Sequence, residues 1–347
     1  MNSYTIKDSL LQSLINEWAK TKEVVAPVKS ENFTKFEKIS DSKEIVWGAP
    51  QTVISPKKYF SPQNEILLEY KIQEQNAITQ PVIDDQNRIL FGVHPCDING
   101  IFLMDGVFSE GTKDDWYLAR RNSTIIIGVD CLVPCSKEAI CNRMDGLNPR
   151  ERFDAFITKL GGGLCLVEVK TEKAEKLFEG SLKPANFIDK LRLKMVRDRR
   201  NDLFNKQNEK LLPKYGDLSK LMKNNFASKE WEARGELCYS CGSCNMVCPT
   251  CYCFDIQDYA KINLQSGKRM RVWDGCMLTD FAKIASGENF REERAHRLRH
   301  RTNRKINYLF EKWGQSFCTG CGRCTKACLT KLPNPLEIAN AIYTRKS

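Results

Sequence analysis

Two cysteine motifs of identical spacing constrain this chain of 347 residues more than any other feature. The first reads C-x2-C-x2-C-x3-C-P from Cys238 to Pro249, and the second repeats the C-x2-C-x2-C-x3-C spacing from Cys318 to Cys328. Three thiolates spaced in this way can wrap a tight loop around a [4Fe–4S] cube and hold three of its iron corners. The fourth iron needs a ligand from farther away, which a second copy of the motif can supply. The sequence therefore predicts two [4Fe–4S] clusters.

The crossed arrangement of two-cluster ferredoxins assigns eight ligands, because the fourth cysteine of each motif binds the other motif's cluster. Structural zinc is the alternative. Zinc takes four ligands per metal, commonly from C-x2-C pairs, and two C-x2-C-x2-C-x3-C motifs fit that requirement poorly. Leu329 follows the last cysteine where the first motif has Pro249, a difference that removes no ligand. The predicted ligands are Cys238, Cys241, Cys244 and Cys328 for cluster one, and Cys248, Cys318, Cys321 and Cys324 for cluster two.

Two apolar, β-branched runs indicate a parallel sheet in the N-terminal part. The runs RILFGV (88–93) and STIIIGV (123–129) flank a segment, CDINGIFLMDGVF, that reads as a helix. Strand, helix and strand in this order predict a βαβ unit with parallel strands. LCLVEV (164–169), after a glycine triplet, is another expected strand, and apolar residues at helical spacing from Ile6 to Trp18 predict a first helix with Ser3 or Thr5 as its cap.

Half of the sixteen cysteines lie outside the two motifs. Cys96 and Cys131 follow the two apolar runs, and parallel neighbouring strands bring their carboxyl ends side by side, so these two thiols are expected to converge. A third cluster is one hypothesis for the remaining cysteines, and buried structural thiols are the other, since a free cysteine packs as a small hydrophobic residue. Cys165, inside an expected strand, is assigned to the core. The candidate ligands of a third cluster are Cys96, Cys131, Cys141, Cys251, Cys253 and Cys276.

The C-terminal part is expected to be helical throughout. Residues 254–265, 275–286, 292–314 and 335–345 all lack the alternation of a strand. The long separation of the two motifs also favours a helical dicluster domain over the compact ββ type. The predicted fold class is α+β: an N-terminal α/β domain with a parallel strand core (1–185), a basic helical connector (186–225) and an all-helical dicluster ferredoxin-like domain (226–347).

The formal charge of +11 raises the question of nucleic-acid binding, because many arginines crowd the stretch from Arg291 to Lys305. No helix-turn-helix or zinc-finger pattern accompanies that stretch, so a basic helix near anionic clusters or an acidic partner is preferred and no nucleic-acid partner is expected. No apolar run approaches the roughly 18 residues of a membrane span, and no export signal begins the sequence. We expect a cytoplasmic location without membrane insertion.

Several segments together resemble a known family. RILFGVHPCDINGI, DDWYLARRNSTIIIGVDC, CYSCGSCNMVCPTCYCFDIQD, RVWDGC, the stretch 287–304 and FCTGCGRCTKAC are similar to the iron–sulfur β subunit of soluble sulfhydrogenases and to the A subunit of anaerobic sulfite reductase. The resemblance covers about residues 88 to 343. This chain departs from the pattern after Cys131: of the usual Cys-Phe-Cys pair only Cys141 is present, and Cys135 is additional.

The resemblance implies a non-catalytic electron-transfer subunit of an anaerobic oxidoreductase, so no catalytic residue is expected in this chain. Its partners would be a flavin-containing subunit of ferredoxin-reductase type, which reacts with NAD(P)H, and a catalytic subunit, either a nickel–iron hydrogenase or a sirohaem sulfite reductase. A freely diffusing ferredoxin-like carrier is the alternative, although a simple carrier needs no large N-terminal module. A cluster-based nucleic-acid-binding regulator is the less favoured third interpretation.

Overall fold

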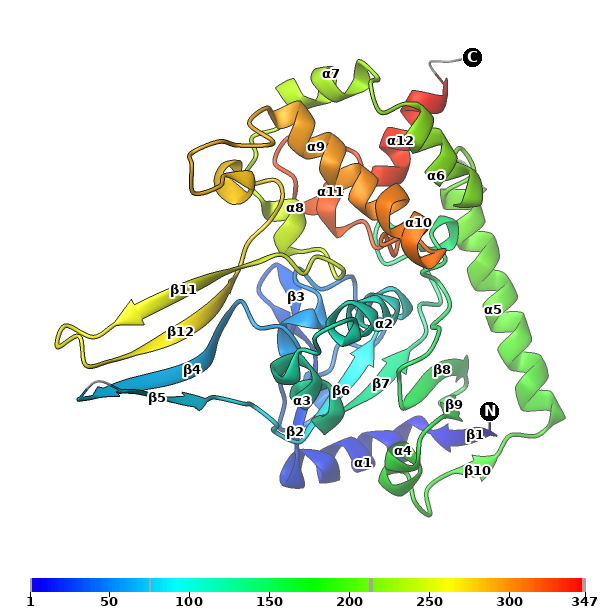
Figure 1. Ribbon diagram of the computed structural model, residues 1–347. Helices are drawn as coiled ribbons and strands as arrows, with labels where there is room; N and C mark the ends of the chain where they lie inside the picture. Colours follow the sequence, from blue (N-terminus) through cyan, green and yellow to red (C-terminus); the bar gives the residue numbers. More distant parts are fainter. Residues whose placement is uncertain (1, 75, 212–214, 345–347) are drawn as a thin grey trace.

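Four parallel strands form the centre of an eight-stranded sheet in the computed structural model, which describes residues 2–74, 76–211 and 215–344 (Figure 1). The strands β2, β6, β7 and β8 run parallel, and the outer neighbours pair antiparallel. The predicted βαβ unit is confirmed, because β6 and β7 pair in parallel with helices between them. The order across the sheet is β10 (Lys183–Pro184), β1 (Asn2–Lys7), β9 (Leu164–Val169), β8 (Ala155–Gly161), β7 (Thr124–Val129), β6 (Arg88–Val93), β2 (Glu23–Ser30) and β3 (Phe33–Lys38).

Both faces of the central strands are covered by helices. On one face Ile89 and Phe91 of β6 pack with residues of α1 (Asp8–Thr21) and α4 (Glu172–Leu177). On the other face Leu90 packs with α2 (Pro95–Ser109) and α3 (Asp115–Ser123). Every residue of β6 is buried, which explains why the run is apolar without alternation. A side chain at Gly128 of β7 would meet Ile98 of α2 at 2.5 Å, so only glycine permits this close helix–sheet contact.

The first helix begins later than the sequence predicted. Residues 2–7 are the strand β1, which pairs with β9, and α1 starts at Asp8 with no side-chain cap, so the proposed caps Ser3 and Thr5 were wrong. The expectation failed because Ile6 is buried by the sheet and not by the helix. Leu11, Ile15 and Trp18 do form the buried face of α1 as expected.

The basic segment after the sheet forms a long helix, α5 (Phe187–Gln207), which runs from the sheet to the helical part of the molecule (Figure 1). Arg200 of α5 donates to Asp130 at 2.8 Å, directly after β7, and Arg197 donates to the same carboxylate at 3.3 Å. These contacts fasten α5 to the carboxyl edge of the sheet. Helix α6 (Tyr215–Asn224) follows, and residues 212–214 of the expected connector lie outside the described residues. The three-domain division stays a prediction.

Short helices build the upper part of the molecule in Figure 1. The helical predictions for 292–314 and for the described part of 335–345 are confirmed. Trp231, Met222, Leu298 and Leu336 belong to the apolar core of this part. Its elements are α7 (Glu230–Glu236), α8 (Ser243–Met246), α9 (Arg294–Asn303), the π-helical turn η5 (Arg304–Tyr308), α10 (Leu309–Trp313), α11 (Arg323–Ala327) and α12 (Pro335–Thr344). Single 3-10 turns are η1 (Ser42–Glu44), η2 (Pro56–Tyr59), η3 (Cys141–Arg143) and η4 (Thr279–Ala282).

The prediction of an all-helical C-terminal domain was wrong. Residues 254–273 form a hairpin, β11 (Phe254–Ala260) and β12 (Ser266–Trp273), and 275–286 contains only the turn η4. Strand β12 pairs with β4 (Asn64–Gln73), which pairs with β5 (Asn76–Pro81). Most of β11 is exposed on both faces, so its side chains show no apolar alternation that the sequence could reveal. Strand β11 pairs with β12, and hydrogen bonds from β12 to β4, some two hundred positions away, hold the hairpin in place.

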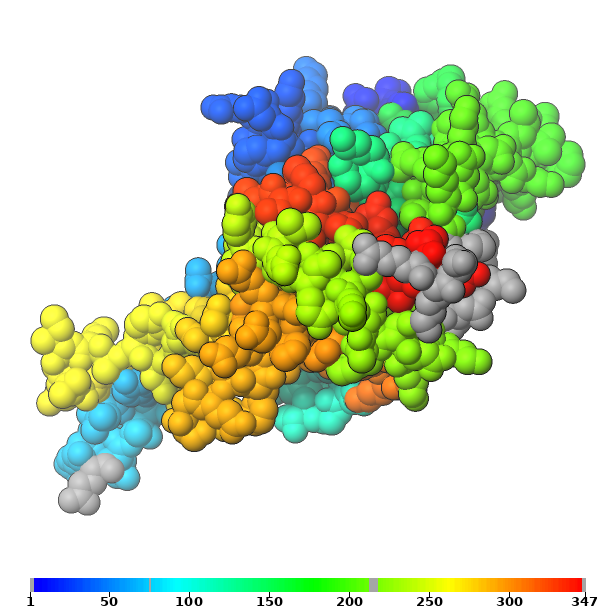
Figure 2. Space-filling view, turned by 90° about the horizontal axis from the view of Figure 1, so that it is seen from above, coloured from blue at the N-terminus to red at the C-terminus, as the bar shows by residue number. Residues whose placement is uncertain are grey.

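These two hairpins form a second sheet that projects from the body as an arm (Figure 2). The light-blue hairpin β4–β5 and the yellow hairpin β11–β12 lie side by side in both views, in the order β11-β12-β4-β5. At its base, Glu65 of β4 is buried and forms ion pairs with Arg120 of α3 and with Arg271 of β12, the latter at 2.5 Å. Arg271 also pairs with Asp114. No helix among the described residues is long and apolar enough to cross a membrane.

We expect Arg271→Met to lower the free energy of unfolding by about 3–5 kcal/mol, because it leaves two carboxylates with one cation fewer at a buried position. The midpoint of urea unfolding under anaerobic conditions measures this change. Arg269→Met is the matched control, since Arg269 lies on the same strand in an exposed pair with Asp258 and its loss should leave the midpoint nearly unchanged. Equal shifts for the two variants would contradict the role given to the buried network.

Candidate iron–sulfur sites

The two cysteine motifs fold into loops of matching shape. Ser240 (φ 54°) and Gly242 (φ 72°) adopt left-handed backbone in the first loop, and Gly320 (φ 70°) and Gly322 (φ 75°) do so in the second. The short helices α8 and α11 follow these turns and pack against each other. Left-handed residues reverse the chain within each loop. The two motifs thus form a pair of facing loops.

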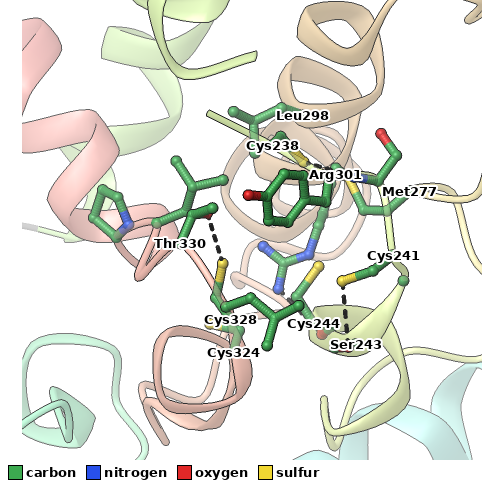
Figure 3. Close-up of a pocket in the computed structure, with 16 residues that line it drawn as sticks. Cys238, Cys241, Ser243, Cys244, Met277, Leu298, Arg301, Cys324, Cys328 and Thr330 are labelled. Atoms are coloured by element: carbon green, nitrogen blue, oxygen red, sulfur yellow. Dashed lines mark hydrogen bonds between the residues drawn. The ribbon is translucent and has the colours of Figure 1, made fainter. Parts of the chain in front are cut away.

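One cavity lies between the first loop and the end of the second. Cys238, Cys241 and Cys244 line it together with Cys328, the last cysteine of the other motif. Figure 3 shows these sulfur atoms around a common space into which the guanidinium of Arg301 extends. Two hydroxyls contact the sulfurs: Ser243 Oγ lies 3.3 Å from Cys241 Sγ, and Thr330 Oγ1 lies 3.4 Å from Cys328 Sγ.

A second cavity adjoins the first. Its lining includes Cys318, Cys321 and Cys324 of the second motif and Cys248 of the first. Cys324 lines both cavities, as does Arg301, so the two sites are neighbours. The structure thus brings together the two sets of four cysteines expected from crossed ligation, although ligation itself stays a prediction.

Two buried cations lie among these cysteines. Arg301 donates from Nη2 to the carbonyl oxygen of Cys244 at 3.3 Å, and Lys305 donates to the carbonyl and hydroxyl oxygens of Thr250 at 3.0 and 2.9 Å. Burial opposes both charges, but neighbouring cysteines, Cys244 for Arg301 and Cys248 for Lys305, outweigh it and raise the pKa of both groups. Both cations therefore stay charged and favour negative charge at the sulfurs.

The residues present fit an anionic cluster. Arg301 Nε is buried and has no hydrogen-bond partner among the described residues. The buried hydroxyls of Thr319 and Thr325, inside the second motif, also have none there. A [4Fe–4S] cube with four thiolates carries a net charge of about −2 and offers sulfur acceptors to such donors. Unpaired donors and buried cations around four thiols are the surroundings that such a group needs.

The thiols differ in how readily they ionise without metal. Burial raises the pKa of Cys244 and of Cys318 to about 12. Cys241 is exposed, and the hydroxyl of Ser243 holds its pKa below the usual value. The buried thiols would therefore have to lose their protons to hold a metal.

Four cysteines outside the motifs gather at the carboxyl edge of the large sheet. Cys96, Cys131, Cys135 and Cys141 belong to one apolar cluster that also contains Cys321. The expected convergence of Cys96 and Cys131 is confirmed. Cys135 was missed as a candidate, although its position in the same loop, four residues after Cys131, was a usable signal.

The other three candidates lie elsewhere, beside the first loop. The amide nitrogen of Asn245 lies 3.6 Å from Cys251 Sγ and 3.5 Å from Cys276 Sγ. Cys253 lies near Cys276. The six candidates of the sequence therefore fall into two separate groups. Cys165 in β9 joins neither; its thiol donates to Asp8 at 2.8 Å within the core of the sheet.

Comparisons with known proteins agree with this geometry. Residues 237–332 match a family model described as a 4Fe-4S dicluster domain. The sulfhydrogenase 2 subunit beta of Pyrococcus furiosus is 31% identical to this chain over 312 residues, which cover 89% of this chain and 89% of that protein. No solved structure matches the chain significantly.

We expect Arg301→Gln to lower the midpoint potential of the iron-loaded protein, because a nearby positive charge stabilises the added electron. At an effective dielectric constant of about 20, losing a unit charge that lines the cavity removes about 2–4 kcal/mol of attraction, or on the order of 100 mV. A redox titration followed by electron paramagnetic resonance (EPR) measures it. Arg299→Gln is the control, since Arg299 on the same helix stacks on Phe226 instead. Indistinguishable potentials in the two variants would contradict the placement of Arg301.

Proposed function

The chain belongs to the iron–sulfur β-subunit family of sulfhydrogenases, and on this basis we propose that it relays electrons inside a multi-subunit oxidoreductase. Its partners would be a flavin-containing subunit of ferredoxin-reductase type, which reacts with NAD(P)H, and a nickel–iron hydrogenase subunit. The similarity to a sulfhydrogenase subunit favours the hydrogenase partner over a sirohaem sulfite reductase.

The pair of neighbouring cysteine-lined cavities is the observation that carries this proposal. Cluster one would bind Cys238, Cys241, Cys244 and Cys328, and cluster two would bind Cys248, Cys318, Cys321 and Cys324. Such clusters accept and release one electron at a time. The protein's own contribution would be to hold the thiols, to exclude water from the buried ones, and to balance their charge with Arg301 and Lys305.

The arrangement of the two cavities supports a relay. Cys324 lines both, which keeps the two proposed clusters within a short distance of each other. The first cavity reaches the surface, because Cys241 is exposed and the neighbouring Tyr239 and Leu329 are exposed too. An outer site near the surface and an inner site behind it suit the passage of electrons between a partner and the interior.

The surface of the arm favours a subunit over a freely diffusing carrier. Large apolar side chains are exposed along it, among them Ile78, Ile262 and Leu264. A projecting sheet with exposed apolar residues is typical of a surface that binds another protein. A ferredoxin-like carrier needs neither this arm nor the large sheet.

We expect the anaerobically reconstituted chain to bind at least about eight iron and eight sulfide per chain. Cys248→Ala and Cys328→Ala should each lose about four of these iron atoms, because each removes one ligand of one cube. Iron and sulfide assays measure the loss. Cys165→Ala is the control and should keep the wild-type count, since its thiol contacts Asp8 in the sheet. Stoichiometric zinc with almost no iron would refute the proposal.

We also expect the native protein to co-purify anaerobically with a flavoprotein and a nickel-containing subunit. Size-exclusion chromatography with flavin and nickel analysis of the peak measures this. A monomer of the chain's own mass, 39.8 kDa, would contradict the complex. A sirohaem absorption spectrum in the peak would instead assign the sulfite reductase partner.

A further inference from the structure

We propose that Cys96, Cys131, Cys135 and Cys141 hold a third [4Fe–4S] cluster at the carboxyl edge of the large sheet. The proposal rests on the electron-transfer function proposed above and extends it into the N-terminal half of the chain. Three of these cysteines, Cys96, Cys131 and Cys141, were candidate ligands from the sequence. Cys135 is added because it packs in the same cluster.

The topology of the sheet brings the first two thiols together. Strands β6 and β7 are parallel neighbours, so their carboxyl ends lie at the same edge. Cys96 lies in the first turn of α2, three residues after the end of β6, and Cys131 lies two residues after the end of β7. Ligands commonly bind at this edge of an open parallel sheet.

The loop after β7 supplies the other two thiols and is held in place from two sides. Ile140 donates its backbone N–H to the carbonyl oxygen of Gly320 at 2.7 Å, and Asn208 at the end of α5 donates to the carbonyl oxygen of Ala139 at 3.0 Å. A side chain at Gly320 would lie 2.7 Å from the Cα of Cys141. The backbones of the two loops therefore touch, which fixes the position of Cys141.

The four thiols lie in one apolar cluster, in which Cys96 and Cys141 are buried and Cys131 and Cys135 are half-buried. They pack together with Ala139, Leu147 and Phe204, and the thiols of Cys96 and Cys141 are within hydrogen-bond distance of each other. All four are free thiols rather than disulfides. Four cysteines from two sequence segments in one packed cluster match the ligand number of a [4Fe–4S] cube.

A buried cation lies beside this group as well. Arg323 of α11 forms a two-pronged ion pair with Asp97, with N–O distances of 2.5 and 2.7 Å. The thiols of Cys321 and Cys96 lie near the same guanidinium. Arg323 thus lies between a proposed ligand of cluster two and the group at the sheet edge.

The competing group is less complete. Cys251, Cys253 and Cys276 provide three thiols, and the neighbouring Cys248 is required by cluster two. A cube there would have to share that cysteine or bind a ligand other than sulfur. The group at the sheet edge needs neither.

The position of the third site continues the relay inward. Cys321, a proposed ligand of cluster two, packs in the same apolar cluster as the four thiols. Cys141 Sγ lies 3.3 Å from the carbonyl oxygen of Gly320, the residue before Cys321. The three proposed clusters would therefore follow one another from the exposed Cys241 to the edge of the large sheet.

The test is a set of iron counts and EPR spectra on the full chain, reconstituted anaerobically. We expect about twelve iron atoms per chain in the wild type and about eight in Cys135→Ala and in Cys131→Ala, with the spectral component of one reduced cluster lost. Cys276→Ala is the matched control and should keep about twelve. Circular dichroism confirms that the variants fold, and retention of the other eight iron atoms shows that the ferredoxin-type sites are intact.

Two results would overturn the proposal. One is a wild-type count of about eight, which rejects the third cluster but leaves the two-cluster function standing. The other is a loss of about four iron atoms in Cys276→Ala while Cys135→Ala keeps the wild-type count, which moves the third cluster to the competing group. If the proposed two-cluster function itself were wrong, Cys248→Ala and Cys328→Ala would lose no iron, a result that neither of these two outcomes gives.

Discussion

The buried cations Arg301 and Lys305 are the constraint on which the helical half of this protein depends. A charge without water is costly, and the groups that raise the pKa of these two cations are motif cysteines and the neighbouring Cys251 and Cys276. Their helix therefore has to pack against both loops at once. Lys305 belongs to the π-helical turn η5, a distortion that often marks functional positions. Part of the excess of positive charge in the sequence thus lies inside the protein, beside the motif cysteines.

The N-terminal half takes part in the same construction. The segment before β4 reaches the ligand loops: Gln51 donates to the carbonyl oxygen of Cys321, and Lys57 donates to that of Cys251 at 2.8 Å. Arg323, between two motif cysteines, donates to the carbonyl oxygen of Thr52 at 2.8 Å. These contacts make the ligand loops continuous with the sheet. The cluster sites are therefore part of one integrated fold and not an appended ferredoxin.

Sequence reasoning succeeded where local spacing carries the information. The buried strand β6 and the parallel pairing with β7 followed from an apolar run, a helix and a second run. It failed for β11 and β12, because the exposed β11 carries no apolar pattern and β12 is held by hydrogen bonds to the distant β4. It also failed at the first helix, where Ile6 is buried against the sheet. In each failure, a partner distant in the sequence decided the local conformation.

The sequence by itself identified the eight motif cysteines as expected ligands and predicted that each motif lends its fourth cysteine to the other cluster. It could do so because a [4Fe–4S] cube requires a particular spacing of thiolates, which can be read directly from the chain. Only the tertiary structure decided how the other cysteines group. Cys135 and Cys141 meet Cys96 and Cys131 because the loop after β7 is held between α5 and the second motif. Likewise, only packing turned Arg301 and Lys305 inward. A residue's neighbours across the fold depend on which surfaces pack together, and one stretch of sequence does not contain that information.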